Sequence, residues 1–384
     1  MHFDFATAGR ILFGAGRWSE TGPLARSLGT RALLVTGQNR ERAAGLEANL
    51  MSSGLTVTSL KIAGEPTVAD AVSGAHLARE ERLQVVVCFG GGSVLDAGKA
   101  IAALAPHPGD PLRFLEVIGQ GLPLEHDPLP VIAIPTTAGT GSEVTRNAVL
   151  GSPEHRVKVS LRSPKMLPRV ALVDPSLSLS LPPHLTASTG LDALTQLLEA
   201  YVSSRANPMT DLFCREGLTR VPSALLRAYH RGDDLSARSD LALGALYSGL
   251  ALGNAGLGAV HGLAGPLGGR CPGPHGSLCA ALLAPITAAN LRALQERQPQ
   301  NPSLHRYQEA LCWMTGRASS KVEELPSLLR EWVKTMEIPG LSFWGVTPEG
   351  FPDLIRQAQQ SSSMKGNPVP LTPLELETAL QEAL

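Results

Sequence analysis

Cysteine and clustered basic residues are scarce in this chain of 384 residues. The five cysteines are odd in number and form no C-x-x-C pair, so the sequence indicates neither a disulfide framework nor a thiolate zinc site. This usage is typical of the reducing cytoplasm. The formal net charge is −1, and no block of lysine and arginine occurs. These features argue against nucleic acid or an anionic membrane surface as the main partner and favour a small molecule.

Long apolar runs are missing as well. No stretch of about 18 uninterrupted apolar residues occurs, as a membrane span would require. Residues 1–10 contain no basic segment followed by an apolar one, as a secretory signal would. We therefore expect no membrane partner and a protein that stays in the cytoplasm.

Short apolar runs in the first half of the chain alternate with helix-like segments. This alternation predicts an α/β fold, in which a mostly parallel sheet has helices on both faces. Ligands in such folds bind at the carboxyl ends of the strands. The predicted strands cover residues 32–35, 56–62, 85–89, 131–134 and 170–173, and the predicted helices cover 40–53, 67–81 and 94–103.

The second half of the chain changes character after Asp174-Pro175. Because single cores stop growing at about 250–300 residues, two domains are expected in a chain of this length. Residues 174–183 predict a linker, in which Ser and Leu alternate before two prolines. We place the α/β domain at 1–178 and an all-helical domain at 179–384. Helical spacing predicts helices at residues 186–202, 208–229, 236–252, 258–267, 279–294 and 304–315.

A glycine-rich turn at residues 90–99, Gly-Gly-Gly-Ser-Val-Leu-Asp-Ala-Gly-Lys, joins a predicted strand to a predicted helix. Consecutive glycines leave backbone N–H groups uncovered, and the helix N-terminus adds the positive end of its dipole. The turn therefore suits a phosphate or pyrophosphate. It lacks the G-x-G-x-x-G spacing, so a tight connection that binds nothing is the alternative.

The helical half contains an acid and two histidines that can be metal ligands. Asp192 and Gln196 stand four residues apart on one face of a predicted helix. His261 and His275 follow, each beside a glycine. A carboxylate and two imidazoles are typical of a catalytic divalent-metal site with an open position. The alternative is that these are ordinary core or surface histidines.

Four blocks in order give the chain a family resemblance: GGGSVLDAGKAIA (90–102), PTTAGTGSEVT (135–145), residues 174–203 with LPPHLTASTGLDALTQLLEAYVS, and VHGLAGPLGGRCPGPHG (260–276). Together they resemble the iron-containing, or group III, alcohol dehydrogenases over nearly the whole chain. The resemblance implies an N-terminal dinucleotide-binding domain and a helical domain that holds a metal in the cleft between them. It also implies hydride exchange between a nicotinamide and an alcohol, aldehyde or ketone, and a homodimer.

The resemblance assigns roles to individual residues of this chain. It implies that Asp96 and Lys158 lie at the catalytic, nicotinamide end, and that Asp192, His261 and His275 are metal ligands, with Gln196 as a weak fourth. The implied cofactor-binding residues are Gly37, Gly91, Gly92, Ser93, Thr136, Thr137, Thr140, Lys158 and Leu177.

Three positions depart from the family pattern. Gln196 stands where a ligand histidine is usual, so metal affinity is expected to fall, with Fe2+ or Zn2+ the best-fitting ions. Gly265 replaces a frequent second histidine of the cleft, which removes a candidate proton-relay group. Gly37 stands where the family usually has an acid at the end of the first strand. Such an acid repels the 2′-phosphate of NADP, and Gly37 removes that repulsion.

Cofactor choice follows from the last departure. Donors and positive charge near Gly37 come from Gln38, Asn39, Arg40 and Arg42, so NADP is expected to be tolerated beside NAD. The alternative is that both arginines only face solvent. For the function as a whole, a maleylacetate-type reductase that does not rely on metal, a dehydroquinate-synthase-like lyase and a non-catalytic dinucleotide-binding relic are the alternatives.

Overall fold

The computed structural model describes residues 2–155 and 157–384, with the side chain of Arg40 also left undescribed. Contacts divide the chain into two compact units. The α/β unit comprises Ala6–Thr137 and Gly141–Ser178, and the helical unit comprises Leu179–Leu384 with the segment ending at Phe5 and Ala138–Thr140. This division differs from the expected 1–178 and 179–384 in those two short segments.

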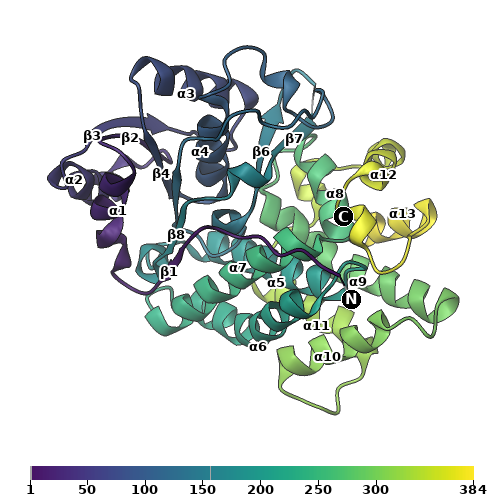
Figure 1. Cartoon of the computed structure of the whole chain (residues 1–384). Coiled ribbons are helices and arrows are strands. Elements are labelled where there is room, and N and C mark those ends of the chain that lie inside the picture. The colour runs from purple at the N-terminus through teal and green to yellow at the C-terminus, as the bar shows by residue number, and fades with distance from the viewer. Residues whose placement is uncertain (1, 156) are drawn as a thin grey trace. The chain divides into compact units, whose positions relative to one another are not determined.

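The α/β unit is built on a six-stranded parallel sheet (Figure 1). Its strand order is β1-β8-β5-β4-β2-β3. The strands are β1 (Ile11–Phe13), β2 (Arg31–Thr36), β3 (Thr56–Lys61), β4 (Val85–Gly90), β5 (Val131–Pro135) and β8 (Val170–Val173). All five predicted strands are present, and the predicted α/β fold class is confirmed. β1 was not predicted, because three residues carry too little periodicity.

Helices cover both faces of this sheet, because the buried residues of the central strands alternate between two cores. Val85 and Val87 join the core with α1 (Thr21–Leu28) and α2 (Ala44–Ser52). Val86 and Cys88 join the core with α3 (Val68–Glu80) and α4 (Gly92–Leu104). Side chains of adjacent strand residues point to opposite faces, and here both faces bury them.

An antiparallel hairpin that the sequence did not predict packs against α3 and α4. It consists of β6 (Asn147–Ser152) and β7 (Val157–Arg162), and its buried Leu150 and Val159 share a core with alanines of both helices. Half-buried alternation over six residues is a weak signal beside the continuous apolar runs of the parallel strands.

The helical unit has one large core, and no strand occurs after β8 in the part of the chain that the structure describes. The predicted all-helical character is therefore correct. Its helices are α5 (Pro183–Val202), α6 (Pro208–His230), α7 (Leu235–Ala255), α8 (Ala259–Gly268), α9 (His275–Arg297), α10 (Ser303–Thr315), α11 (Leu325–Thr335), α12 (Phe351–Gln360) and α13 (Pro373–Glu382).

Helix α9 is long and apolar enough to cross a membrane by length and composition alone, but 89% of its apolar window is buried inside the structure. Such burial is expected of the core helix of a packed domain. The bent pair of α7 and α8 passes the same test, with an angle of 98° between the helices.

Candidate metal centre and dinucleotide-binding turn

The glycine-rich turn leads from β4 directly into α4. Gly91 is the N-cap residue of α4, and no side chain caps this helix start. A Cβ on Gly90 would lie 2.5 Å from a methyl group of Val94, so only glycine fits there. The uncapped N-terminus of a 13-residue helix presents backbone N–H groups and a positive dipole end, which together favour a phosphate.

Neighbouring strand ends bring the other predicted cofactor residues to the same edge of the sheet. β4 lies between β2 and β5, so Gly37, the turn at Gly91 and Thr136 follow three adjacent parallel strands. The backbone N–H of Thr136 donates to the carbonyl of Gly90 at 2.9 Å. Thr140 differs from these residues, because it belongs to the helical unit.

Asp96, predicted to be catalytic, is held by several hydrogen bonds inside the α/β unit. Its carboxylate accepts from the Ser142 hydroxyl and, at 2.9 Å, from the backbone N–H of Val149. Its third partner is the buried ammonium of Lys99, at 3.1 Å. These bonds tie α4 to the loop at Ser142 and to β6. These contacts give Asp96 a structural role, and its catalytic role stays a prediction.

The remaining predicted cofactor residues lie on strands and loops of the α/β unit. Lys158, on β7, forms an ion pair with Glu65 at 3.1 Å. The carbonyl of Leu177 accepts from the Arg42 guanidinium at 2.8 Å, so Arg42 is anchored to the backbone. The Arg40 side chain lies outside the described residues. A Cβ on Gly37 would come no closer than 4.0 Å to a neighbour, so packing does not require glycine there.

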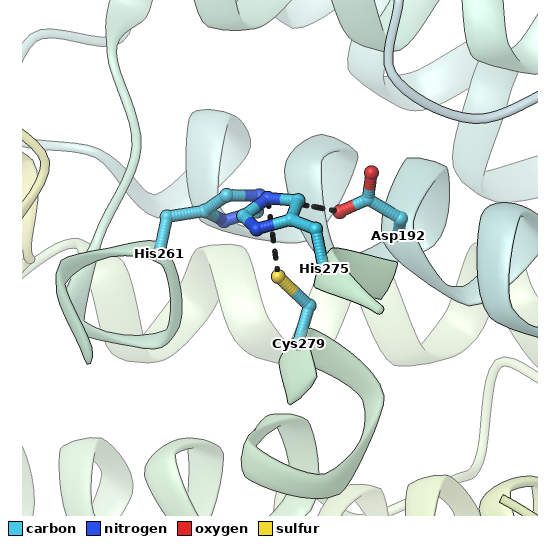
Figure 2. A group of neighbouring side chains, drawn as sticks. All are labelled: Asp192, His261, His275 and Cys279. Carbon is cyan, nitrogen blue, oxygen red and sulfur yellow. Dashed lines mark hydrogen bonds and ion pairs between the residues drawn. The ribbon is translucent and has the colours of Figure 1, made fainter. Parts of the chain in front are cut away.

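Four side chains from three helices converge in the helical unit (Figure 2). Asp192 comes from α5, His261 from α8, and His275 and Cys279 from α9. His275 and Cys279 share one face of α9 because they stand four residues apart. One ligand atom of each residue lies within 4.8 Å of all the others. The structure thus brings together three predicted ligands and a cysteine that was not predicted.

The spacing of these atoms matches a small tetrahedral ion. Asp192 Oδ1 lies 3.4 Å from His261 Nε2 and 3.9 Å from His275 Nε2, and Cys279 Sγ lies 3.6 Å from His275 Nε2. Donors that bind zinc at about 2.0–2.3 Å in a tetrahedron are about 3.3–3.8 Å apart. The donor set therefore fits a first-row divalent ion.

Two of the donor atoms are buried without a hydrogen bond among the described residues: Oδ1 of Asp192 and Nε2 of His261. Leaving buried polar atoms unpaired costs about 1–3 kcal/mol each, so such atoms call for an explanation. A bound cation would satisfy both.

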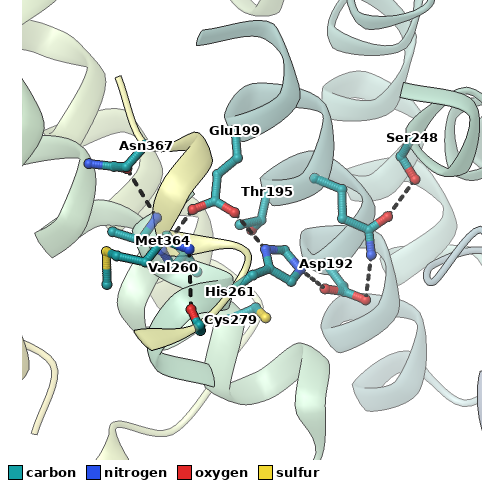
Figure 3. A network of polar contacts seen from close by, with 12 residues as sticks. Asp192, Thr195, Glu199, Ser248, Val260, His261, Cys279, Met364 and Asn367 are labelled. Carbon is teal, nitrogen blue, oxygen red and sulfur yellow. Dashed lines mark hydrogen bonds and ion pairs between the residues drawn. The ribbon is translucent and has the colours of Figure 1, made fainter. Parts of the chain in front are cut away.

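Glu199 holds His261 in the orientation that a metal ligand needs (Figure 3). The carboxylate of Glu199, one turn beyond Gln196 on α5, accepts from His261 Nδ1 at 2.6 Å and from the backbone N–H of Val260 at 2.7 Å. With the proton on Nδ1, the lone pair of Nε2 faces the cluster. A carboxylate behind a ligand histidine is the usual outer support of such sites.

Gln196, the predicted weak fourth ligand, is a direct neighbour of the cluster through Asp192. Its amide nitrogen donates to Asp192 Oδ2 at 3.0 Å, and its amide oxygen accepts from the Ser248 hydroxyl at 2.7 Å. In Figure 3, dashed contacts lead from Ser248 to Asp192 through one unlabelled side chain. Gln196 thus fixes Asp192 with Oδ1 directed into the cluster.

The electrostatics of the cluster favour a cation. Burial raises the pKa of Asp192, but the neighbouring imidazoles of His261 and His275 lower it by more, so the net pKa is below its usual value. The pKa of Cys279 is also lowered, since the two imidazoles outweigh its burial. Although burial opposes it, the pKa of His261 is raised well above its ordinary value, chiefly by the charge of Cys279. Without a metal, protons balance the two anionic ligands.

Close packing positions the start of α9 against α5. A Cβ on Gly276 would lie 2.3 Å from the carbonyl oxygen of Ser188, so only glycine allows this approach next to His275. Gly265, where the family often has a second histidine, has open space, with no atom within 4 Å of a Cβ.

Sequence reasoning missed Cys279 and Glu199. Cys279 was set aside because no C-x-x-C pair exists, although it stands four residues after His275 and the helix predicted at 279–294 begins at it. Glu199 follows Asp192 by seven residues, which places both on one face of α5, and this signal was also available.

Comparison with known proteins agrees with this geometry. Residues 8–175 match the family described as iron-containing alcohol dehydrogenase, and residues 186–384 match its C-terminal family. The chain is 34% identical over 377 residues to alcohol dehydrogenase 4 of Saccharomyces cerevisiae (strain YJM789), covering 97% of this chain and 96% of the relative. It is 38% identical to 1,3-propanediol dehydrogenase of Citrobacter freundii, with 77% of each chain covered.

Solved structures are similar over the full length. A crystal structure of a 1,3-propanediol oxidoreductase gives a TM-score of 0.91 at 30% identity and covers 100% of both chains. A sulfoacetaldehyde reductase from Bifidobacterium kashiwanohense in complex with NAD+ gives 0.86 at 26% identity, covering 100% of this chain and 99% of that one.

Proposed function

Because the chain belongs to the iron-containing alcohol dehydrogenase family and is an NAD-dependent alcohol oxidoreductase, we propose that it interconverts an alcohol with an aldehyde or ketone by means of a divalent metal ion. The ion is held by Asp192, His261 and His275. The observation that carries this proposal is the pair of buried, unpaired donor atoms among the described residues, Asp192 Oδ1 and His261 Nε2, which face one another across the cluster.

A divalent ion at this position supplies Lewis acidity toward an alcohol or carbonyl oxygen. The protein's own residues prepare the site for it. Glu199 keeps the proton of His261 on Nδ1, and Gln196 holds one oxygen of Asp192 so that the other is free for the metal. His275 is the most accessible of the three, with 33% of its side chain exposed, and substrate approaches from its side.

The nicotinamide cofactor binds along the carboxyl edge of the parallel sheet. Its pyrophosphate lies on the uncapped start of α4, at Gly91, Gly92 and Ser93, with Thr136 and Thr137 on the next strand end. Lys158 and Leu177 lie toward the nicotinamide end, as does Asp96. Thr140 is proposed as a further cofactor-binding residue on the basis of the family resemblance.

NADP is accepted as well as NAD, because Gly37 and not an acid stands directly after β2. A side chain would fit at Gly37, so packing does not explain why no acid stands at this position. Arg42 is near this position but already donates to Leu177, which leaves it less free to pair with a 2′-phosphate. Comparing KM for NADH and NADPH tests this point: a KM for NADPH far above that for NADH would contradict it.

We further propose that the enzyme is a cytoplasmic homodimer that acts on small alcohols or carbonyls and has no nucleic-acid or membrane partner. All five cysteines are free in the structure, as a reducing compartment requires. The near-zero net charge supports the absence of polyanionic partners.

The test is the absorbance change of NAD(P)H with a panel of alcohols, aldehydes, ketones and maleylacetate. Turnover of simple alcohols or carbonyls that is abolished by a chelator, restored by added metal and lost in His275→Ala supports the proposal. Reduction of maleylacetate alone, unaffected by chelator, would indicate the metal-independent reductase. Dinucleotide binding without turnover of any compound would indicate the relic.

A further inference from the structure

Cys279 is a ligand candidate that the role assignments from the family resemblance leave out. We propose that Cys279 Sγ is the fourth protein ligand of the metal and gives the site a preference for zinc-like ions over iron(II). This inference rests on the proposed function for the presence of a metal, and it adds the identity of a ligand and the selectivity that follows.

Geometry places the sulfur inside the donor set. Cys279 is buried, and its Sγ lies 3.6 Å from His275 Nε2 and within 4.8 Å of the donor atoms of Asp192 and His261. Because α9 supplies both His275 and Cys279 one turn apart, a single rigid element fixes two donors. Figure 2 shows the sulfur directed toward the two imidazole rings.

Gln196 is not available for the same task. Both ends of its amide are engaged, the nitrogen with Asp192 Oδ2 and the oxygen with Ser248. Reversing the amide would place its oxygen against the Asp192 carboxylate, which repels it. Gln196 stands where the family usually has a ligand histidine, but here it positions Asp192. The fourth donor comes instead from Cys279 on α9.

The charge and softness of this set favour zinc. Asp192 and a Cys279 thiolate contribute two negative charges and the imidazoles none, so a divalent ion makes the buried cluster neutral. Soft thiolate donors select zinc among the common divalent ions, whereas harder oxygen donors do not. Zinc also has no strict geometric preference and can accept a further donor during catalysis, so four protein ligands still permit a substrate.

Cobalt(II) substitution tests the ligand directly. A thiolate bound to cobalt(II) gives an intense near-ultraviolet charge-transfer band, which imidazole and carboxylate donors do not give. The full-length protein is stripped of metal and titrated with cobalt(II) under reducing conditions. We expect the band in the wild type and in Gln196→Ala, and its loss in Cys279→Ser. Cys312→Ser is the matched control, since that cysteine lies outside the cluster, and it keeps the band.

The possible failures are distinguishable. Cobalt that binds the wild type without the band, or a band that survives in Cys279→Ser, overturns the assignment of Cys279 and leaves the proposed metal site standing. A wild type that binds no cobalt at all overturns both. Circular dichroism checks that Cys279→Ser is folded. If it is not, the wild-type spectrum still tests the assignment, because the other four cysteines lie outside the cluster.

Metal competition provides a second readout that does not depend on activity. Stripped protein is equilibrated anaerobically with zinc and iron(II), and the bound metals are measured. We expect the ratio of zinc to iron affinity to fall about 10-fold or more in Cys279→Ser and to stay unchanged in Cys312→Ser. An unchanged ratio in Cys279→Ser would contradict the claim that Cys279 gives the site its preference for zinc.

Discussion

Replacing Glu199 by glutamine should disable His261 as a metal donor without changing the size of the side chain. The Glu199 carboxylate accepts two hydrogen bonds, from His261 Nδ1 and from the backbone N–H of Val260. A glutamine oxygen can accept only one of them in this geometry. If it accepts from Val260, its NH2 group faces Nδ1, which must then become an acceptor. The proton moves to Nε2, the atom that faces the cluster.

The size of the effect follows from the role of this support. Outer residues that fix a ligand histidine typically contribute 10–100-fold to metal affinity, which is about 1.4–2.7 kcal/mol. Glu199 should lie at the upper end, because its bond to Nδ1 is short at 2.6 Å and both partners are buried.

Competition with a chromophoric chelator measures the metal dissociation constant in the wild type and in Glu199→Gln. Glu309→Gln is the matched control, because Glu309 also accepts a hydrogen bond, from Tyr201 at 2.7 Å, but lies outside the cluster. We expect weaker binding only in Glu199→Gln. Equal dissociation constants for Glu199→Gln and the wild type would refute the argument from the proton position.

Two further predictions concern stability. Burial is the main cause that raises the pKa of Glu143 from 4.5 to about 7. The unfolded chain therefore loses this proton at lower pH than the native protein, and the free energy of unfolding falls between about pH 4.5 and 7, by up to about 3 kcal/mol. Glu143→Gln should remove that fall in urea titrations; parallel pH profiles would argue against it. In thermal unfolding, Gly276→Ala should cost about 1–3 kcal/mol, because its Cβ meets the Ser188 carbonyl at 2.3 Å. Gly265→Ala, with open space, is the control and should gain up to about 1 kcal/mol.

The fold was largely predictable because its strongest signals are local. Val85 to Phe89 form a continuous apolar run, and such runs mark parallel strands that are buried on both faces. The hairpin of β6 and β7 escaped prediction, since its stability comes from packing Leu150 and Val159 onto alanines of α3 and α4. Those contacts link residues far apart in the sequence, so no local pattern encodes them.

The candidate site was predictable where a motif carries its residues and not where geometry does. Asp192, His261 and His275 stand in recognisable blocks, and the structure brings them together. Cys279 lies beyond those blocks, and only the direction of its side chain from α9 reveals it. The contacts of Gln196 are likewise not visible in the sequence. Its bonds to Asp192 and Ser248 depend on the packing of α7 against α5, which the sequence does not display.

Activity measured against bound metal tests the central claim most directly. Stripped protein is titrated with zinc or iron(II), and the metal content per chain and the alcohol-dependent reduction of NAD are measured on the same samples. The account predicts that activity rises in proportion to bound metal and stops rising when each chain holds a single ion. Full activity in protein that contains almost no metal would contradict it.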